Sequence, residues 1–153
     1  MCSSDLGAKG EGADFTEASL SGCDFRGAVL PGADFTLAHV ERADFTEAAL
    51  DDARMNEAWA AEVVLERASL VDFRAESADL KGARLAGARA DGALWQASRL
   101  DGARFDGCSL KEALFSRAVL DGASLARVVA VEADFRRARM HQVTLLQIGR
   151  AHV

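Results

Sequence analysis

The side chains that could carry out chemistry are spread along the chain rather than gathered into a motif. His39 and His141 lie far apart, and no group of cysteines and carboxylates has the spacing of a metal site. No serine or aspartate has a histidine close enough to serve as its base. The glycines follow one fixed spacing and do not form a phosphate-binding loop. We therefore predict no catalytic residues, no metal and no cofactor.

The most regularly placed reactive side chains are Asp14, Asp24, Asp34 and Asp44. In the coil geometry derived below, Asp14 and Asp34 stack on one face, and Asp24 and Asp44 stack on the opposite face. One interpretation is that they form acidic columns that bind a partner. The other is that they stabilise turns by accepting local hydrogen bonds, as aspartate commonly does.

The elements that position these side chains follow a five-residue repeat, which runs in register from Ala13 to Leu145. In 27 repeats the first inward position is alanine 20 times, and the second inward position is Leu, Phe, Val, Met or Trp 23 times. Of the 13 glycines, 11 share one phase of the repeat, which predicts a turn residue with positive φ.

A period of five is incompatible with ordinary helices and strands. In an α-helix, five residues advance the face by about 140°, so an apolar stripe would spiral around the surface. In a plain strand, an odd period sends successive apolar residues to opposite faces. A corner in every repeat removes both conflicts, because the chain turns before its next inward pair. The repeat therefore predicts a solenoid.

The motif Ala-Asp-Phe-Thr-Glu, found at residues 13–17 and 43–47, resembles the pattern of the pentapeptide repeat proteins. The resemblance covers most of the chain. It implies an all-β fold, a right-handed quadrilateral β-helix in which four pentapeptides form one square coil of 20 residues. About seven such coils, at a strand spacing of roughly 4.8 Å, would form a rod on the order of 30 Å long.

A 20-residue coil places the large aromatic residues in columns on two opposite faces of the core. This predicted structural core comprises Phe15, Phe25, Phe35, Phe45, Trp95, Phe105, Phe115 and Phe135. The pattern is least regular between residues 53 and 80, where Phe73 occupies a small-residue slot and Ala75 a large-residue slot. We interpret this as an exchange in which the large Phe73 side chain fills the space that the small Ala75 leaves. Trp59 and Val64 fall at an outward phase, so a kink, a bulge or a contact patch is consistent with this region.

The charge reverses along the chain. Residues 11–80 carry 16 acidic and 5 basic side chains, whereas residues 81–150 carry 7 acidic and 12 basic ones, within an overall net charge of −6. Opposite charges on stacked neighbours would relieve repulsion at a solvated surface. Outward apolar residues gather late in the chain, Leu94 and Leu114 on one face and Val129 and Val131 on another. These four residues are a candidate apolar contact patch.

The ends depart from the repeat. We assign residues 1–12 to an irregular N-terminal segment and residues 13–147 to the repeat domain. Residues 1–6 and 148–153 resemble translations of a sequencing adapter, so we expect the natural reading frame to continue beyond both ends.

We expect a soluble, cytoplasmic domain, because no apolar run approaches membrane length and residues 1–10 lack the features of a signal peptide. The three cysteines do not form a disulfide framework, because Cys23 and Cys108 lie about four coils apart, too far to bridge. This cysteine usage is consistent with a reducing compartment.

Two function classes remain open. The first is a non-catalytic protein-interaction or structural scaffold module within a larger bacterial protein, such as the repeat tail of a type VI secretion accessory protein. The second is mimicry of DNA, since some pentapeptide repeat proteins resemble duplex DNA, bind DNA gyrase and protect it from quinolones. The basic second half of the chain departs from that pattern. We expect a protein partner, of which gyrase is one candidate, and neither direct nucleic-acid binding nor membrane binding.

Overall fold

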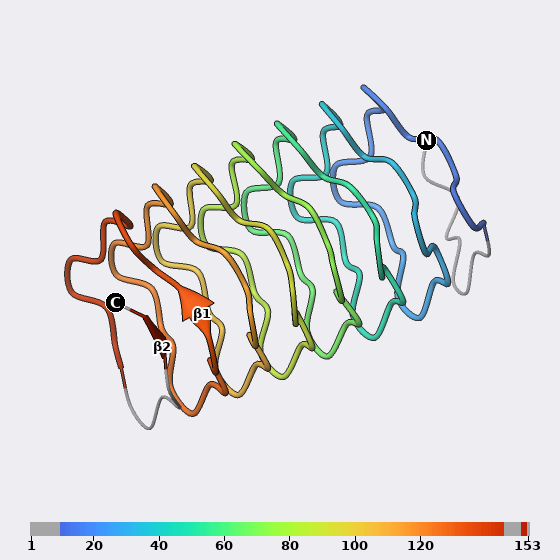
Figure 1. Cartoon of the computed structure of the whole chain (residues 1–153). Helices are drawn as coiled ribbons and strands as arrows, with labels where there is room; N and C mark the ends of the chain where they lie inside the picture. The colour runs from blue at the N-terminus through green and yellow to red at the C-terminus, as the bar shows by residue number, and fades with distance from the viewer. Residues whose placement is uncertain (1–9, 146–150, 153) are drawn as a thin grey trace.

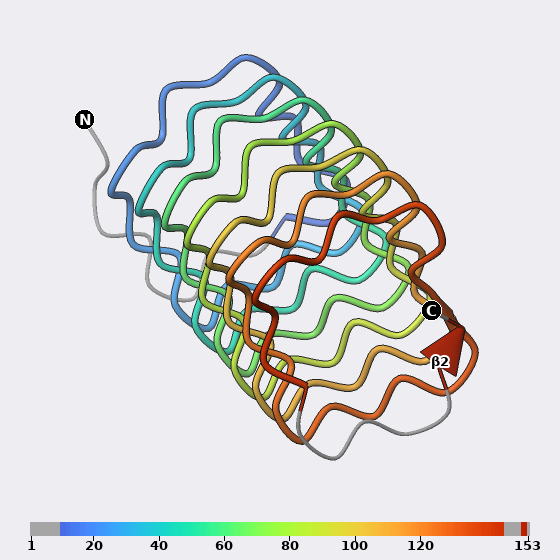
Figure 2. The same ribbon diagram turned by 90° about the vertical axis from the view of Figure 1, so that its left-hand side faces the viewer.

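The chain is a β-helix whose coils stack along a single axis. The computed structural model describes residues 10–145 and 151–152. Figure 1 shows the coils following one another from the N-terminal to the C-terminal end, and Figure 2, turned by 90°, shows their outlines laid over one another. Within the described residues there is no α-helix, and hence none that could cross a membrane.

Parallel bridges join each coil to the next. Each bridge pairs a residue with the residue twenty positions later, from Asp14–Asp34 near one end to Ser124–Thr144 near the other. Four such bridging positions occur in every coil, so a coil contains four pentapeptides. Most bridges are single residues between corners. The two-residue strands β1 (Ala133–Asp134) and β2 (Ala151–His152) pair in parallel at the C-terminal end, with Ala133 opposite Ala151.

The backbone amides of each pentapeptide are hydrogen-bonded in a repeating pattern, as buried polar groups require. The N–H of Phe15 donates to Asp34 O at 2.7 Å in the next coil, and the N–H of Asp34 donates back to Ala13 O at 2.9 Å. The corner is closed by the N–H of Ala18, which donates to Phe15 O at 3.0 Å. The coils therefore support one another through their backbones, independently of side-chain type.

The N–H of the first corner residue lies outside this ladder, and at several corners an aspartate side chain accepts a hydrogen bond from it in one of two ways. In the first, Asp Oδ1 accepts from the residue two positions later, as Asp34 does from Thr36 N–H at 2.9 Å. In the second, a carboxylate of the preceding coil accepts from the residue twenty positions later, as Asp51 does from Val71 N–H at 2.9 Å. Both arrangements satisfy a donor that water would otherwise have to cover.

The interior is filled by the two inward positions of each repeat. Phe15 stacks on Phe35 with ring centroids 4.8 Å apart, and Phe25 stacks on Phe45 at the same distance. The two stacks meet edge to face, since Phe35 and Phe45 lie 5.5 Å apart with an interplanar angle of 83°, a favourable geometry for aromatic pairs.

The predicted core residues are buried in the structure, with one exception. Phe25, Phe35, Phe45, Trp95, Phe105, Phe115 and Phe135 are all buried. Phe15 is only partly buried, and it belongs to the first coil that the structure describes.

The irregular stretch between residues 53 and 80 causes no break in the coil. Bridges continue through it, from Arg54–Arg74 to Asp79–Arg99. Phe73 and Ala75 are both fully buried, and the Phe73 ring lies 5.5 Å from Trp95 in the next coil. The large side chain in the small slot thus fills the space left by the alanine beside it.

The second corner residue of each repeat has positive φ. Glycine occupies this position at Gly22 and Gly82, but many other repeats place a side chain there, such as Leu37 with φ of 58° and Ala97 with φ of 57°. None of the non-glycine residues with positive φ in the described part of the chain is β-branched. This is the expected selection, since a branched Cβ is the least tolerant of the left-handed region.

Substitution at Ala97 is therefore expected to change stability according to backbone strain alone. Ala97→Gly should stabilise the fold by about 0.5–1 kcal/mol, and Ala97→Val should destabilise it by about 1–2 kcal/mol. At Ala86, whose φ is not positive, glycine should instead destabilise by about 0.5–1 kcal/mol. Urea unfolding of the three variants measures these differences, and equal signs for the two glycine variants would contradict the explanation.

The cysteines differ from one another. Cys108 is a free, buried thiol. Cys23 is disulfide-bonded, which was not expected, whereas the expectation that Cys23 and Cys108 do not bridge each other agrees with the free thiol of Cys108. The argument for a reducing compartment therefore loses its support from Cys23. The assignments made for residues 1–6 and for most of 148–153 lie outside the described residues.

Candidate functional site

The four N-terminal aspartates lie in two columns on the surface. Bridges place Asp14 beside Asp34, and Asp24 beside Asp44. All four accept a hydrogen bond from the backbone N–H two residues later, for example Asp44 from Thr46 at 2.9 Å. These carboxylates therefore stabilise corners while they also contribute negative charge to the surface.

Two of these carboxylates have lowered pKa values. The side-chain and backbone hydrogen bonds from Arg26 hold the pKa of Asp24 at about 2, below its ordinary 3.8. The Arg26 guanidinium makes two contacts with Asp24, at 2.9 Å and 2.6 Å. Hydrogen bonds from the hydroxyl and the backbone of Thr16 likewise lower the pKa of Asp14. Both groups are charged over the whole physiological range.

The charge of the side chains in both columns changes from negative to positive farther along the rod. Asp34 is followed by Arg54 and Arg74, and Arg54 Nη1 lies 3.7 Å from Asp34 Oδ2. Asp44 is followed by Val64 and then by Arg84. In these two columns the negative charge is thus confined to the first coils. A partner that requires negative charge along the whole length of a column would find the second half unfavourable.

The late apolar residues lie on more than one face. Leu94 bridges Leu114, and both are half-buried, whereas Val129 and Val131 are exposed by 44% and 39%. Leu114 borders a hollow of about 330 Å³, which is also lined by Glu132, Asp134 and Arg136.

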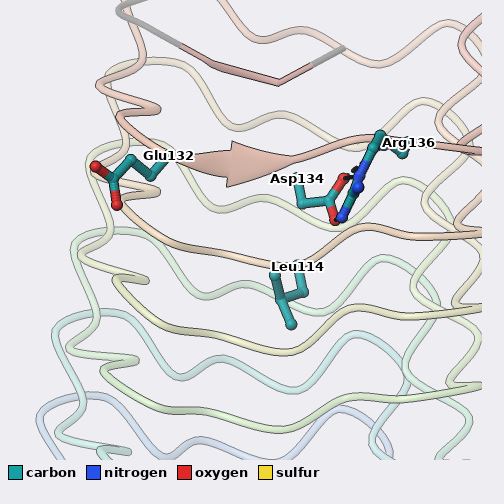
Figure 3. A pocket seen from close by; sticks show the side chains of 4 residues that line it. All are labelled: Leu114, Glu132, Asp134 and Arg136. Carbon is teal, nitrogen blue, oxygen red and sulfur yellow. Dashed lines mark hydrogen bonds and ion pairs between the residues drawn. The ribbon is translucent and has the colours of Figure 1, made fainter.

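Figure 3 shows that the Leu114 hollow is dominated by a charged pair. The side chains of Asp134 and Arg136 face each other above Leu114, and Glu132 lies apart at the bend. Arg136 contacts Asp134 at 2.9 Å and 2.7 Å. The hollow thus joins a charged pair that is satisfied within the chain to the apolar side chain of Leu114.

A stacked pair of rings forms the most distinctive exposed feature. His39 and Trp59 bridge each other in adjacent coils, with ring centroids 4.4 Å apart and an interplanar angle of 4°. Trp59 is 45% exposed, although the other tryptophan, Trp95, is fully buried. Exposed tryptophan is characteristic of binding sites, because one large rigid side chain supplies much contact area at a small entropic cost.

Acidic groups surround this stack. His39 Nδ1 lies 3.3 Å from Glu41 Oε1, and Ser21 donates to the other oxygen of Glu41 at 2.6 Å. Burial alone would raise the pKa of Glu41, but the hydrogen bonds from Ser21, from its own backbone and from His39 outweigh burial and lower it. Glu41 is therefore a fixed negative charge beside the rings.

A shallow hollow of about 280 Å³ opens next to the stack. Glu17, Leu37, His39 and Trp59 line it. A carboxylate, an aliphatic side chain and two aromatic rings form a suitable environment for a guanidinium or ammonium group, which is attracted both by the carboxylate and by aromatic faces. A neutral or anionic ligand would leave the carboxylate without a counter-charge.

Other reactive side chains offer little chemistry. Among the described residues, no group of three His, Cys, Asp or Glu side chains could hold a metal ion. Burial raises the pKa of Cys108 to about 12, so this thiol stays protonated, and it donates to Leu85 O at 2.8 Å. His141 lies against Asp121 at 3.4 Å, far along the rod from His39.

Trp59 was expected at an outward position, where it lies, but its stacking on His39 was not predicted. The signal was available, since the two residues are separated by one coil of twenty residues and occupy the same outward phase. The carboxylates that bind an amide of the following coil were missed for a similar reason. Asp51, for example, accepts from the N–H of Val71, which is twenty residues away in the sequence. These aspartates occupy the first corner residue of a repeat, and no sequence motif distinguishes them from other corner residues.

Comparison with known proteins identifies the repeat. The family model described as pentapeptide repeats matches residues 11–46, 78–117, 97–137 and 108–145, in 8 copies. No curated protein sequence matches the chain significantly.

Among solved structures, a trypsin-treated variant of QnrB1, a plasmid-mediated fluoroquinolone resistance protein, superposes with a TM-score of 0.51. It shares 17% sequence identity, and the match covers 95% of this chain and 85% of that one. A pentapeptide repeat protein from the thylakoid lumen of Arabidopsis thaliana is 29% identical, with a TM-score of 0.44 and coverage of 65% and 66%. At 17% identity, the similarity to QnrB1 shows a common fold.

Proposed function

Because the chain belongs to the pentapeptide repeat family, we propose that it is a rigid, non-catalytic interaction module that binds a basic segment of a partner protein. The observation that carries this proposal is the exposed His39–Trp59 stack within the acidic half of the rod. The continuous backbone ladder keeps this surface in one conformation, so little entropy is lost when a partner binds.

We also propose the finer architecture that the family implies. The coil is right-handed, as parallel crossover connections almost always are, and the 27 repeats form about seven coils. A right-handed coil of this length presents the acidic columns, the aromatic stack and the basic second half on one rigid support.

The binding proposal can be tested with short peptides and the fluorescence of Trp59. We expect a hexa-arginine peptide to alter the emission of the full chain in a saturable manner, and a hexa-glutamate peptide to have no effect. Trp59→Ala should weaken arginine binding by about tenfold, measured by calorimetry, because it removes the central contact. Val29→Ala removes a comparably exposed side chain on another face and should leave binding unchanged.

Two outcomes would refute the arginine site. Equal binding of the acidic peptide would show that charge does not select the ligand. Unchanged affinity in Trp59→Ala would show that arginine binds elsewhere on the acidic half, as a diffuse counter-ion.

A second candidate is protection or inhibition of DNA gyrase by mimicry of DNA. The acidic columns of Asp14, Asp34, Asp24 and Asp44 favour it, since a basic groove attracts aligned negative charge. A supercoiling assay with the purified chain tests it. Inhibition that disappears in Asp34→Arg would support mimicry, whereas normal supercoiling at tens of micromolar protein would reject it for this chain.

A further inference from the structure

We propose that a second copy of this chain docks antiparallel on one face of the rod, forming a symmetric dimer centred on Val64. The face is defined by the Asp24 column, in which bridges connect Asp24, Asp44, Val64, Arg84 and Arg104 in successive coils. This column has two negative charges on one side of an apolar centre and two positive charges on the other. The proposal rests on a different column from the basic-partner site described above, and Glu41 borders both surfaces.

A two-fold axis brings the negative end of this column in one copy against the positive end of the same column in the other copy. The axis lies in the plane of the face, crosses the rod at Val64, and turns the second copy end over end. Each coil before the centre then faces the coil equally far behind the centre in the other copy. Asp44 faces the partner's Arg84, Asp24 faces the partner's Arg104, and Val64 meets its own copy. A two-fold interface requires this kind of self-complementary surface.

The residues that flank the column extend the match. On one side, Glu41 falls opposite the partner's Lys81, because these residues lie one coil before and one coil after the centre. On the other side, Arg26 falls opposite the partner's Asp106, two coils from the centre. The central coil contributes Ala61, which leaves room for close approach. Each complementary contact occurs twice in the dimer.

Ion pairs within one chain are compatible with this arrangement. Asp24 contacts Arg26 at 2.6 Å, and Arg104 lies 3.8 Å from Asp106. In the dimer these two pairs face each other in opposite order, so that four charges alternate in sign. Glu66 would face its own copy, but Arg84 lies 2.6 Å from it and neutralises it.

The Asp14 column on the opposite face is the strongest alternative, since it also contains two aspartates followed by two arginines. There, however, Asp34 and Arg54 are adjacent and are already paired at 3.7 Å within the chain. In the Asp24 column, Val64 separates the opposite charges, so Asp44 and Arg84 do not pair with each other. Within the chain Asp44 accepts hydrogen bonds from Thr46. Arg84 contacts Glu66 at 2.6 Å, and in the dimer its guanidinium would be shared between Glu66 and the partner's Asp44.

The size of the contact face determines how tightly the two copies are expected to associate. Five coils at a spacing of roughly 4.8 Å give a contact about 20 Å long, which is smaller than a standard interface. Because the complementary groups are exposed charges, their attraction is screened by salt. We therefore expect a weak dimer at low ionic strength that dissociates at about 0.5 M salt.

A charge exchange tests the proposal by sedimentation equilibrium of the full chain. Asp44→Arg and Arg84→Asp should each weaken self-association at least about tenfold, because each variant brings like charges together. Mixing the two variants should restore a heterodimer, since the arginine introduced at position 44 of one variant then faces the aspartate introduced at position 84 of the other. The native pair is thereby reproduced in reversed order. Melting curves check that both variants fold.

The control is Asp34→Arg, which makes the same charge change on the Asp14 column and removes the equivalent corner hydrogen bond. It should leave self-association unchanged, and so should Trp59→Ala. The proposal is overturned if the native chain remains monomeric at low salt, if Asp34→Arg dissociates the dimer as strongly as Asp44→Arg, or if the mixture of variants stays monomeric.

Discussion

Phe105→Asp is expected to unfold the rod. Phe105 is fully buried, and its ring meets Trp95 and Phe115 edge to face, at centroid distances of 5.9 Å and 5.7 Å. Loss of a buried phenylalanine alone typically costs about 3–5 kcal/mol, and an unpaired buried carboxylate adds several more. Such a sum approaches the whole stability of a typical domain, about 5–15 kcal/mol. Since each coil is supported by its neighbours, damage at this position separates the two halves of the rod.

Circular dichroism during heating measures this effect, with Asp34→Ala as the comparison. The Asp34 carboxylate accepts one corner hydrogen bond and lies 3.7 Å from Arg54, so its loss should cost only about 1 kcal/mol. Phe105→Asp should show no cooperative melting, whereas Asp34→Ala should melt a few degrees below the native chain. Equal melting temperatures for the native chain and Phe105→Asp would refute the inward orientation of this position.

The second large effect is expected at Phe73 and Ala75, where large and small residues have exchanged places. Phe73→Ala should destabilise the fold by about 3–5 kcal/mol, because it opens a cavity beneath Trp95. Ala75→Phe should cost about 1–3 kcal/mol or more, because it adds a ring to a filled layer. The double substitution restores the usual order of a small and then a large residue, so it should be more stable than the sum of the two single effects predicts.

A double-mutant cycle by urea unfolding measures this coupling. We expect a favourable interaction of about 1–3 kcal/mol between the two substitutions. Ala86 supplies a control position, since it lies outside the core, and Phe73→Ala combined with Ala86→Gly should be additive. Additivity of Phe73→Ala with Ala75→Phe would contradict the view that the two side chains share one volume.

The sequence alone determined the class of fold, because the information lies within each pentapeptide. A small residue and a large residue at fixed phases require an inward-facing pair, and clustered glycines such as Gly22 and Gly82 require a corner with positive φ. These constraints are local and repeat many times, so single exceptions such as Ala75 do not obscure them.

Other features depended on contacts between coils, which lie twenty residues apart in the sequence. Tertiary structure decided that Trp59 stacks on His39, that Asp51 binds the amide of Val71, and that the coil continues without a break past Phe73. The physical reason is that the backbone ladder accepts almost any outward side chain. What those side chains touch is therefore decided by their neighbours in adjacent coils rather than by the pentapeptide to which they belong.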